Sequence, residues 1–435
     1  MSLVFFEGGA GTGKTTSLVA AVREHLQATP LCEGEQVLAL TFMHGARIRL
    51  EARLRTVPGA GGAIACDTID SFAWMLLRRW RRLAAHRGLL GDFRSPGNFD
   101  EMCTAAAELL RLEPVTRWVH RTHPIAVLDE MQDCHGPRLR IAQELSKLLV
   151  VFAAADGFQD LAGDGSANDA VSWLQGAESC TTLSHNHRTA ITELLVAAAA
   201  VREGKSLTDG KDFKVVQCPS KDVAAAYVAN SIEWYGSDLV VLSPTGPDSS
   251  TFTRQLLERL STKPINVTKG GKKVLGGPYR IRWDVTEESV AREAGISLGL
   301  HDGRSEPLSL ADLVGCKAQS VAKSVVTWAE RRARLTGQES FLPAELGAEL
   351  ARAAQHRRGS PRRRSGPAAM TIHRAKNQEF GNVVILWPYE VTGSSERLRR
   401  LLYNGITRAK RRVLVLVQDK NGERLKAPPF AAAGA

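Results

Sequence analysis

The sequence predicts an α/β protein built on two parallel sheets, and three observations lead to this fold class. A glycine-rich loop at residues 8–15 stands between a short apolar run and a helical stretch. A second apolar run, residues 125–128, ends in two acids. Further short apolar runs follow in the second half of the chain, at 239–242, 383–386 and 413–417. Apolar strands that alternate with amphipathic helices are typical of parallel sheets.

The first element is the strand of residues 2–6, followed by the loop GGAGTGKT, which fits the phosphate-binding pattern G-x4-G-K-[ST]. A helix over 16–26 completes the context, and its N-terminus adds positive potential for an anion. Lys14 is expected to reach the β- and γ-phosphates of ATP, and the Thr15 hydroxyl to hold Mg²⁺. The predicted nucleotide-binding residues of the loop are Gly8, Gly9, Ala10, Gly11, Thr12, Gly13, Lys14, Thr15 and Thr16. The alternative, a chance glycine-rich turn, does not explain the flanking strand and helix.

The strand of residues 125–128 ends in DEMQD, and the carboxyl ends of parallel strands are where open α/β sheets bind ligands. Asp129 is predicted to hold Mg²⁺ through water, and Glu130 to polarise the attacking water. Without the glycine-rich loop, an acidic helix cap would be the better interpretation. With that loop, these acids are its expected partners.

A series of segments, in chain order, resembles the motifs of superfamily 1 helicases of the UvrD/Rep/PcrA type. DEMQD is similar to the second motif of that family. The other similar segments are TFMHGA at 41–46, TIDSF at 68–72, DGFQ at 156–159, VSWLQGA at 171–177, NHRT at 186–189, TIHRAKNQEF at 371–380 and YNGITRAK at 403–410. They extend over nearly the whole chain, and their order is far more specific than any one of them.

The resemblance implies a role for each matched residue. The catalytic set would be Lys14, Glu130, Gln159 as the γ-phosphate sensor, and Arg188 and Arg408 as arginine fingers. His187 and Glu379 would contact the base and the ribose. Single-stranded DNA would be contacted by Thr41, Phe42, His44, Thr68, Ser71, Phe72, Trp173, Thr371 and His373. Taken alone, either arginine could be a solvated surface charge, and core packing remains the alternative for Phe42 and Trp173.

Several departures from the family pattern concern nucleotide and DNA contacts. The loop begins at residue 8, so the glutamine that recognises adenine upstream of it in the family is missing or replaced. His187 stands where a tyrosine usually stacks on the base. ATP is still the expected nucleotide, and base selectivity stays open. Asp70 replaces a histidine, Asn377 and Gln378 replace Gly-Leu, and residues 160–170 are additional.

Composition agrees with an anionic partner. The chain of 435 residues has a formal net charge of +11, with dense arginine clusters at 78–82 and 357–364. Each cluster could contact the phosphates of a nucleic acid. The alternatives are a solvated helix face for the first cluster and a flexible linker for the second. The seven cysteines form no C-x2-C pair, so no zinc or iron–sulfur site is indicated, and a reduced cytoplasmic setting is expected. No signal peptide is expected, and no apolar run reaches membrane-spanning length.

Following the family, residues 1–72 and 124–182 are expected to form one RecA-like domain, with a helical insertion at 73–123. Residues 183–262 and 368–435 would form the second, with an accessory insertion at 263–367 that includes a possible hairpin over 267–283. Both insertions look short.

The sequence is compatible with three functions. The first is an ATP-driven motor on single-stranded DNA that unwinds duplex DNA, 3′→5′ by analogy, as a monomer or a DNA-dependent dimer. The second is a DNA-stimulated ATPase that translocates with little unwinding and serves a nuclease or defence partner; the short insertions favour it. The third, from another class, is a regulatory P-loop NTPase without DNA. RNA as the track is a lesser alternative.

Overall fold

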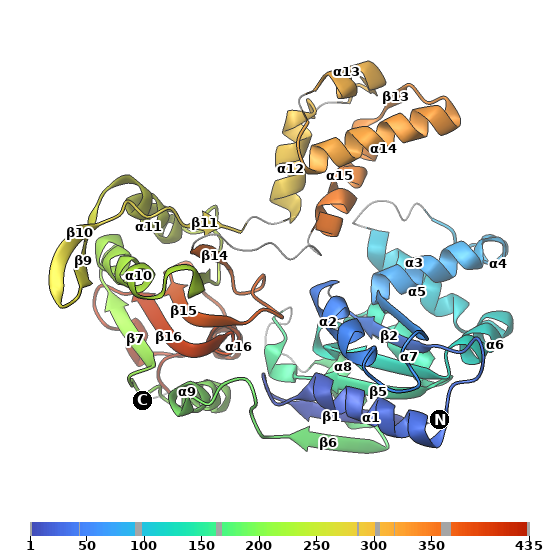
Figure 1. The fold of residues 1–435 in the computed structure, drawn as a ribbon, viewed down its shortest axis with the longest axis horizontal. Coiled ribbons are helices and arrows are strands. Elements are labelled where there is room, and N and C mark those ends of the chain that lie inside the picture. Colours follow the sequence, from blue (N-terminus) through green and yellow to red (C-terminus); the bar gives the residue numbers. More distant parts are fainter. Residues whose placement is uncertain are drawn as a thin grey trace.

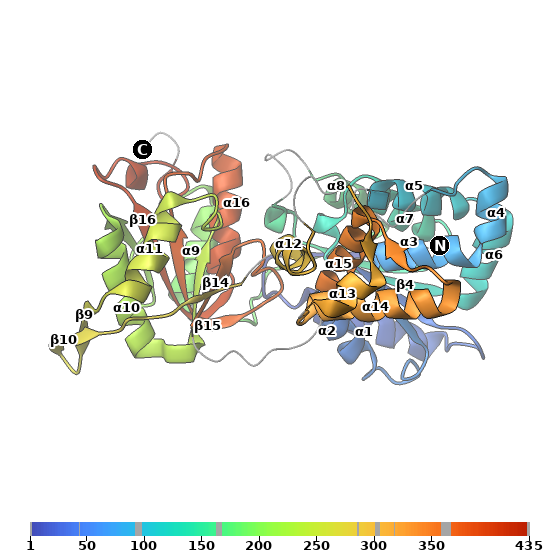
Figure 2. The ribbon, with the colours of Figure 1, turned by 90° about the horizontal axis from the view of Figure 1, so that it is seen from above.

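The computed structural model describes residues 2–42, 44–91, 98–161, 168–284, 287–300, 305–316, 318–357 and 367–432, without the side chains of residues 44, 287–289 and 355–357. It contains two six-stranded parallel sheets covered by helices, which lie side by side (Figures 1 and 2). This confirms the predicted α/β fold class with two RecA-like domains. Among the described residues, no helix combines the length and the apolar character needed to cross a bilayer.

The first sheet has the strand order β3-β2-β4-β5-β1-β6, and every neighbouring pair is parallel. Its strands are β1 (Leu3–Gly8), β2 (Val37–Thr41), β3 (Ile64–Thr68), β4 (Ile125–Asp129), β5 (Val150–Ala155) and β6 (Ser179–Leu183). Side chains alternate between the two faces of the sheet. Val37 and Ala39 pack with helices α1 (Lys14–Ala28) and α2 (His44–Leu54), whereas Leu38 and Leu40 face the opposite helical layer.

That opposite layer contains most of the region expected to be an insertion. It is formed by α3 (Ile69–Arg79), α4 (Arg81–His86), α5 (Phe99–Leu109), α6 (Glu113–Thr122), α7 (Pro137–Ser146) and α8 (Asp169–Gln175). Helix α5 packs between α3 and α7, and Met102, Leu109 and Val115 share one core with the strand residue Leu128. The described residues of 73–123 therefore cover the first sheet and form no separate core of their own, because their apolar positions face the sheet.

The arginines of the first basic cluster, Arg78, Arg79, Arg81 and Arg82, are exposed on this layer. The second cluster lies almost entirely in 358–366, outside the described residues.

The second sheet has the order β11-β14-β8-β15-β16-β7, again with parallel pairs only. Its strands are β7 (Phe213–Cys218), β8 (Leu239–Ser243), β11 (Arg282–Trp283), β14 (Ala368–Thr371), β15 (Phe380–Trp387) and β16 (Ala409–Gln418). Helices α10 (Lys221–Tyr235) and α11 (Thr251–Thr262) cover one face. Helices α9 (Thr192–Glu203) and α16 (Ser395–Ile406) cover the other, which faces the first domain.

The region 263–367 divides into two parts, which corrects the expectation of a single insertion. Strands β9 (Ile265–Lys269) and β10 (Lys272–Gly276) form the expected hairpin, and Gly270 and Gly271 supply the two positive φ angles of its turn. This hairpin packs on α10, and β11 joins the second sheet, so both belong to the second domain.

The remainder is a small helical unit with its own core around Phe341 (Figure 1). It consists of α12 (Glu287–Ser297), β12 (Leu308–Ser309), α13 (Leu310–Gly315), α14 (Val321–Thr336), β13 (Ser340–Phe341) and α15 (Pro343–Arg357). The separate part of the insertion therefore starts only after β11.

The buried position of Phe72 gives a test of the first core. Phe72 is 1% exposed, whereas Phe42, at the end of β2, is 37% exposed. Phe72→Ala is expected to lower the free energy of unfolding by about 3–5 kcal/mol, because the lost ring leaves a cavity. Phe42→Ala, the matched control, should change it by less than about 1 kcal/mol. Denaturant titration measures both; equal losses would contradict the packing described here.

Candidate nucleotide-binding site between the two sheet domains

The glycine-rich loop leaves β1 and enters α1 through two glycines in the left-handed region. Gly11 has φ 79° and Gly13 has φ 87°, and Gly13 is the N-cap of α1. Only glycine adopts these angles without strain, which is why the pattern requires it here. The Lys14 ammonium donates to the carbonyl oxygens of Gly8 at 2.9 Å and Gly9 at 3.0 Å. The loop thus surrounds a buried cation at the N-terminus of a helix.

Thr15 and Asp129 meet although they are far apart in the sequence. The Thr15 hydroxyl donates to Asp129 Oδ2 at 2.9 Å, at the carboxyl end of β4. Burial, followed by the adjacent Glu130 charge, raises the pKa of Asp129 to about 6. A cation bound beside Asp129 would stabilise the ionised form of this carboxylate. A hydroxyl and one carboxylate beside a phosphate loop are the protein ligands that Mg²⁺ typically uses, so the residues fit that metal.

Glu130 has a constrained backbone and a defined partner. Its φ is 59° and its ψ 42°, a left-handed conformation that is rare for a residue with a side chain. Gln132 Nε2 donates to Glu130 Oε2 at 2.6 Å. Burial acts to raise the pKa of Glu130, but the Lys14 charge and the Gln132 hydrogen bond hold it below its ordinary value. The Lys14 charge and the Gln132 hydrogen bond thus favour the ionised form of Glu130, the form that can accept a proton.

The predicted sensor and one predicted finger are in direct contact. Arg408 Nη2 donates to Gln159 Oε1 at 2.9 Å, and the Arg408 side chain is almost completely buried. Burial lowers the pKa of Arg408 to about 10, so the guanidinium stays charged at neutral pH. The two residues come from different domains, and their contact closes the site on one side.

Arg188 lies near Arg408, because both guanidiniums contact Thr407. Its Nε donates to Glu379 at 2.9 Å and its Nη1 to the Thr407 carbonyl at 2.7 Å. A Cβ on Gly11 would lie 2.6 Å from the Cβ of Arg188, so this residue is packed directly against the loop. Glu379 also pairs with Lys410 at 2.9 Å. Burial opposes the ionisation of Glu379, but Arg188 and Lys410 keep its pKa low. A cavity of about 480 Å³ opens beside Glu379 and Lys410.

The segment before Arg188 is hydrogen-bonded to the loop backbone. Asn186 Nδ2 donates to the Ala10 carbonyl at 2.6 Å, and the His187 N–H donates to the Gly11 carbonyl at 2.7 Å. The His187 ring lies near Gly13 and makes an edge contact with His185, with ring centroids 4.6 Å apart. The amide of Asn186 was not singled out from the sequence, although its place in the NHRT segment could have indicated it.

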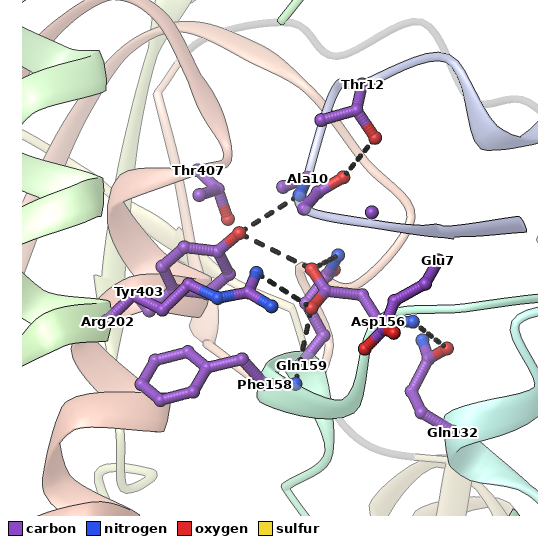
Figure 3. Close-up of polar contacts among 12 residues, drawn as sticks. Glu7, Ala10, Thr12, Gln132, Asp156, Phe158, Gln159, Arg202, Tyr403 and Thr407 are labelled. Atoms are coloured by element: carbon purple, nitrogen blue, oxygen red, sulfur yellow. Dashed lines mark hydrogen bonds and ion pairs between the residues drawn. The ribbon is translucent and has the colours of Figure 1, made fainter. Parts of the chain in front are cut away.

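Three further residues were missed by sequence reasoning: Asp156, Arg202 and Tyr403 (Figure 3). Tyr403 Oη accepts the Ala10 N–H at 3.0 Å and donates to Asp156 Oδ2 at 3.4 Å. Arg202 Nη1 lies 3.2 Å from Asp156 Oδ1. Asp156 and Tyr403 stand inside matched segments, but Arg202 lies in no motif and no sequence signal pointed to it.

Two further contacts join the domains away from the loop. Lys376 Nζ lies 2.6 Å from Asp133 Oδ1, and both side chains are largely buried. Arg49, in α2, donates to the carbonyl oxygen of Asn377. The DEMQD segment is therefore connected directly to the TIHRAKNQEF segment.

The residues expected to contact DNA are divided by the structure. Phe42 is exposed, with the Arg138 guanidinium 5.8 Å from its ring centre, and His373 is exposed. Trp173 and Thr371 are half-buried, with Trp173 packed against the first core. Ser71 is half-buried and is hydrogen-bonded to Thr68. The side chain of His44 lies outside the described residues.

Three of these expectations need correction. Phe72 is a core residue, because its ring points from α3 into the first hydrophobic core. Thr41 is fully buried at the end of β2. Thr68 is 4% exposed and caps α3 by accepting the Ser71 N–H at 3.2 Å. In this conformation these three side chains are not available to DNA.

Comparison with protein families gives two matches. Residues 2–96 are similar to the UvrD/REP helicase N-terminal domain, and residues 368–416 to the UvrD-like helicase C-terminal domain. No curated protein matches the chain. The first match contains the glycine-rich loop and the second contains Lys376, Glu379, Tyr403 and Arg408, so part of each half of the site falls in a matched region. Asp129, Glu130, Gln159 and Arg188 lie outside both matches.

The Asp133–Lys376 pair gives a test of the interdomain contact. Lys376→Ala should lower the free energy of unfolding by up to about 3–5 kcal/mol, because it leaves Asp133 buried without a cation. Adding Asp133→Asn should restore part of the loss, since no charge is then left unpaired. Lys426→Ala, which breaks an exposed pair, is the control and should have no measurable effect. A double variant with a lower free energy of unfolding than Lys376→Ala alone would contradict this account.

Proposed function

We propose that this chain, a UvrD/Rep-type superfamily 1 helicase, hydrolyses ATP between its two RecA-like domains and uses the cycle to move along single-stranded DNA and unwind duplex DNA. The observation that carries the proposal is the convergence of charged groups from both domains on one loop. Lys14, Thr15, Asp129 and Glu130 come from the first domain, and Arg188 and Arg408 reach the same place from the linker and the second domain.

Each group has a distinct task in this proposal. Lys14 and the N-terminus of α1 would neutralise the phosphates. Thr15 and Asp129 would hold Mg²⁺, which when bound neutralises charge on the β- and γ-phosphates. Glu130, ionised and oriented by Gln132, would accept a proton from the attacking water. Gln159 would transmit the state of the γ-phosphate to Arg408, with which it shares a hydrogen bond.

The arginines supply charge where negative charge develops. Arg188 is neutralised by Glu379, while Arg408 pairs with the neutral Gln159 and is fully buried. A buried guanidinium with a neutral partner is poised to gain from an anion. The triphosphate would provide that anion, with its ribose beside Glu379 and the adjoining cavity. Hydrolysis would then depend on the contact between the domains.

The proposed track is single-stranded DNA, read through aromatic stacking and phosphate charge. Phe42 is exposed at the end of β2 beside Arg138, which suits a base-stacking platform. Trp173 is the second candidate. The 3′→5′ direction rests on resemblance alone.

A second candidate function is a DNA-stimulated ATPase and translocase with little unwinding, acting with a nuclease. The packing of the described residues of 73–123 in the first sheet core favours it, because these residues then form no separate accessory subdomain. ATPase activity with and without single-stranded DNA, followed by strand displacement on 3′-tailed and 5′-tailed duplexes, separates the alternatives. Hydrolysis without displacement would select the second function. Hydrolysis indifferent to DNA would select a regulatory NTPase.

Lys14→Ala and Glu130→Gln should differ in what they abolish. Lys14→Ala is expected to eliminate hydrolysis and weaken nucleotide binding, because it removes the charge inside the loop. Glu130→Gln should stop turnover while ATP binding stays within about threefold of wild type, since only proton acceptance is lost. Fluorescent-nucleotide binding and phosphate release measure the two effects. Equal loss of binding in both variants would contradict the assigned roles.

Arg188→Ala and Arg408→Ala should each reduce DNA-stimulated turnover by about 10³–10⁵-fold. Binding of Mg²⁺–nucleotide to the first domain should be mostly retained. Lysine at either position should rescue poorly, because a point charge does not reproduce the planar fork. Full activity of either lysine variant would remove that residue from the proposed transition-state contact.

Trp173→Ala should weaken single-stranded DNA binding by about 1–3 kcal/mol if the indole stacks on a base. The basal ATPase rate and the salt dependence of binding should stay nearly unchanged, because no phosphate contact is lost. Fluorescence anisotropy at several salt concentrations measures this. A large fall in melting temperature with normal DNA affinity would instead support core packing.

A further inference from the structure

The cluster of Asp156, Arg202 and Tyr403 joins the phosphate loop to the second domain by a route separate from the two predicted fingers (Figure 3). Asp156 directly follows the carboxyl end of β5 and is completely buried. Tyr403 reaches it from α16, and Arg202 from α9. We refer to these three residues as the latch cluster.

Tyr403 uses both hydrogen-bonding capacities of its hydroxyl across the domain boundary. The oxygen accepts the Ala10 N–H at 3.0 Å, and the proton is donated to Asp156 Oδ2 at 3.4 Å. Burial raises the pKa of Tyr403 to about 12, so the hydroxyl keeps the proton that it donates. The ring is held by Phe158, with centroids 5.1 Å apart and planes at 90°. Both rotation and position of the hydroxyl are therefore restricted.

Asp156 is the anion on which the cluster is assembled. Its two oxygens accept from Gln159 Nε2 at 2.7 Å and from the Phe158 N–H at 3.2 Å, besides Tyr403. Arg202 Nη1, at 3.2 Å from Oδ1, supplies the cation. The Arg202 guanidinium also lies 5.6 Å from the centre of the Phe158 ring. Because Gln159 bonds to both Asp156 and Arg408, the cluster is connected to the proposed γ-phosphate sensor.

The loop itself is shaped to receive this cluster. A Cβ added at Gly9 would lie 3.0 Å from Tyr403 Oη and 3.4 Å from Arg202 Nη1. A side chain at position 9 would therefore crowd the tyrosine hydroxyl and the guanidinium. The absence of a side chain at Gly9 lets the second domain approach the loop backbone.

We propose that the latch cluster fixes the loop against the second domain when the domains are closed, with Tyr403 as a positioning residue for the Ala10 amide and Arg202 as the charge partner that orients Asp156. This inference rests on the proposed function for its catalytic consequence. It predicts that the hydrogen bond of Tyr403 stabilises the closed, hydrolysing arrangement over an open one, without contributing to nucleotide binding by the first domain alone.

Tyr403→Phe tests the hydroxyl and keeps the ring. The closed fraction, and with it kcat of the DNA-stimulated ATPase, should fall about three- to tenfold, the effect of one hydrogen bond on a two-state equilibrium. The dissociation constant for fluorescent ATP should change by less than about twofold. Tyr389→Phe is the matched control, because the Tyr389 hydroxyl accepts the Lys420 N–H within the second domain only. It should leave kcat unchanged.

Variants of Arg202 test the charge. Arg202 touches Asp156 through one nitrogen, so a point charge is sufficient, and Arg202→Lys should retain at least half of wild-type kcat. Arg202→Gln should lower kcat by at least as much as Tyr403→Phe. Arg412→Gln is the control, because Arg412 makes a similar contact with Asp212 and Tyr235 inside the second domain.

Small-angle X-ray scattering without nucleotide separates this inference from the proposed function. Tyr403→Phe and Arg202→Gln should increase the radius of gyration relative to wild type and to both controls, whether or not the protein hydrolyses ATP. If the wild-type protein did not hydrolyse ATP but the two variants still had the larger radius of gyration, the proposed function would be rejected and the latch cluster would be supported. The proposed role of the latch cluster would be overturned if Tyr403→Phe had the same radius of gyration and the same kcat as wild type. The proposed role would also be overturned if Arg202→Lys lowered kcat as much as Arg202→Gln and the melting temperatures of both variants fell in parallel with kcat. That result would indicate a general loss of stability.

Discussion

The structure depends on the contact between the backbone of the phosphate loop and the second domain. Asn186 and His187 bind the carbonyl oxygens of Ala10 and Gly11, and Tyr403 binds the Ala10 N–H. Every residue carries its backbone N–H and C=O groups whatever its side chain is. A buried backbone group without a hydrogen-bond partner costs free energy. The second domain therefore contributes to the hydrogen bonding of the loop backbone, beside the contacts that Lys14 makes within the first domain. The glycines of this loop allow the second domain to come this close.

Charge is distributed in the site so that an added anion would be stabilised. Lys14 is held by carbonyl oxygens and Arg408 by the amide of Gln159, so two buried cations have neutral partners. Asp129 lies opposite them with a raised pKa, beside the Thr15 hydroxyl. In a Mg²⁺–triphosphate, the negative phosphates would suit Lys14 and Arg408, and the positive metal ion would suit Asp129. The ion pairs between Asp133 and Lys376 and between Asp156 and Arg202 stand beside this region and hold the domains together.

Much of the fold and part of the site could be predicted from local pattern. The strand–loop–helix at the start, the acids that end β4 and the strands β8, β15 and β16 were recognised because each pattern is short and complete in itself. The meeting of Thr15 with Asp129 follows from the parallel order of β1 and β4 in one sheet. The insertion boundaries were less predictable, because residues 73–123 and the β9–β10 hairpin look independent in sequence. Their apolar positions pack on the existing domains.

The sequence alone determined which chemistry is available, because glycine spacing, the lysine and the paired acids act through local backbone geometry. Tertiary structure decided which side chains can take part. Phe72 and Phe42 occur in similar short motifs, yet one ring is in the core and the other at the surface, since the faces of α3 and β2 are set by packing. Arg202 belongs to no motif and gains its role only because α9 passes Asp156. Such a contact depends on how two domains are docked, and no local spacing encodes that docking.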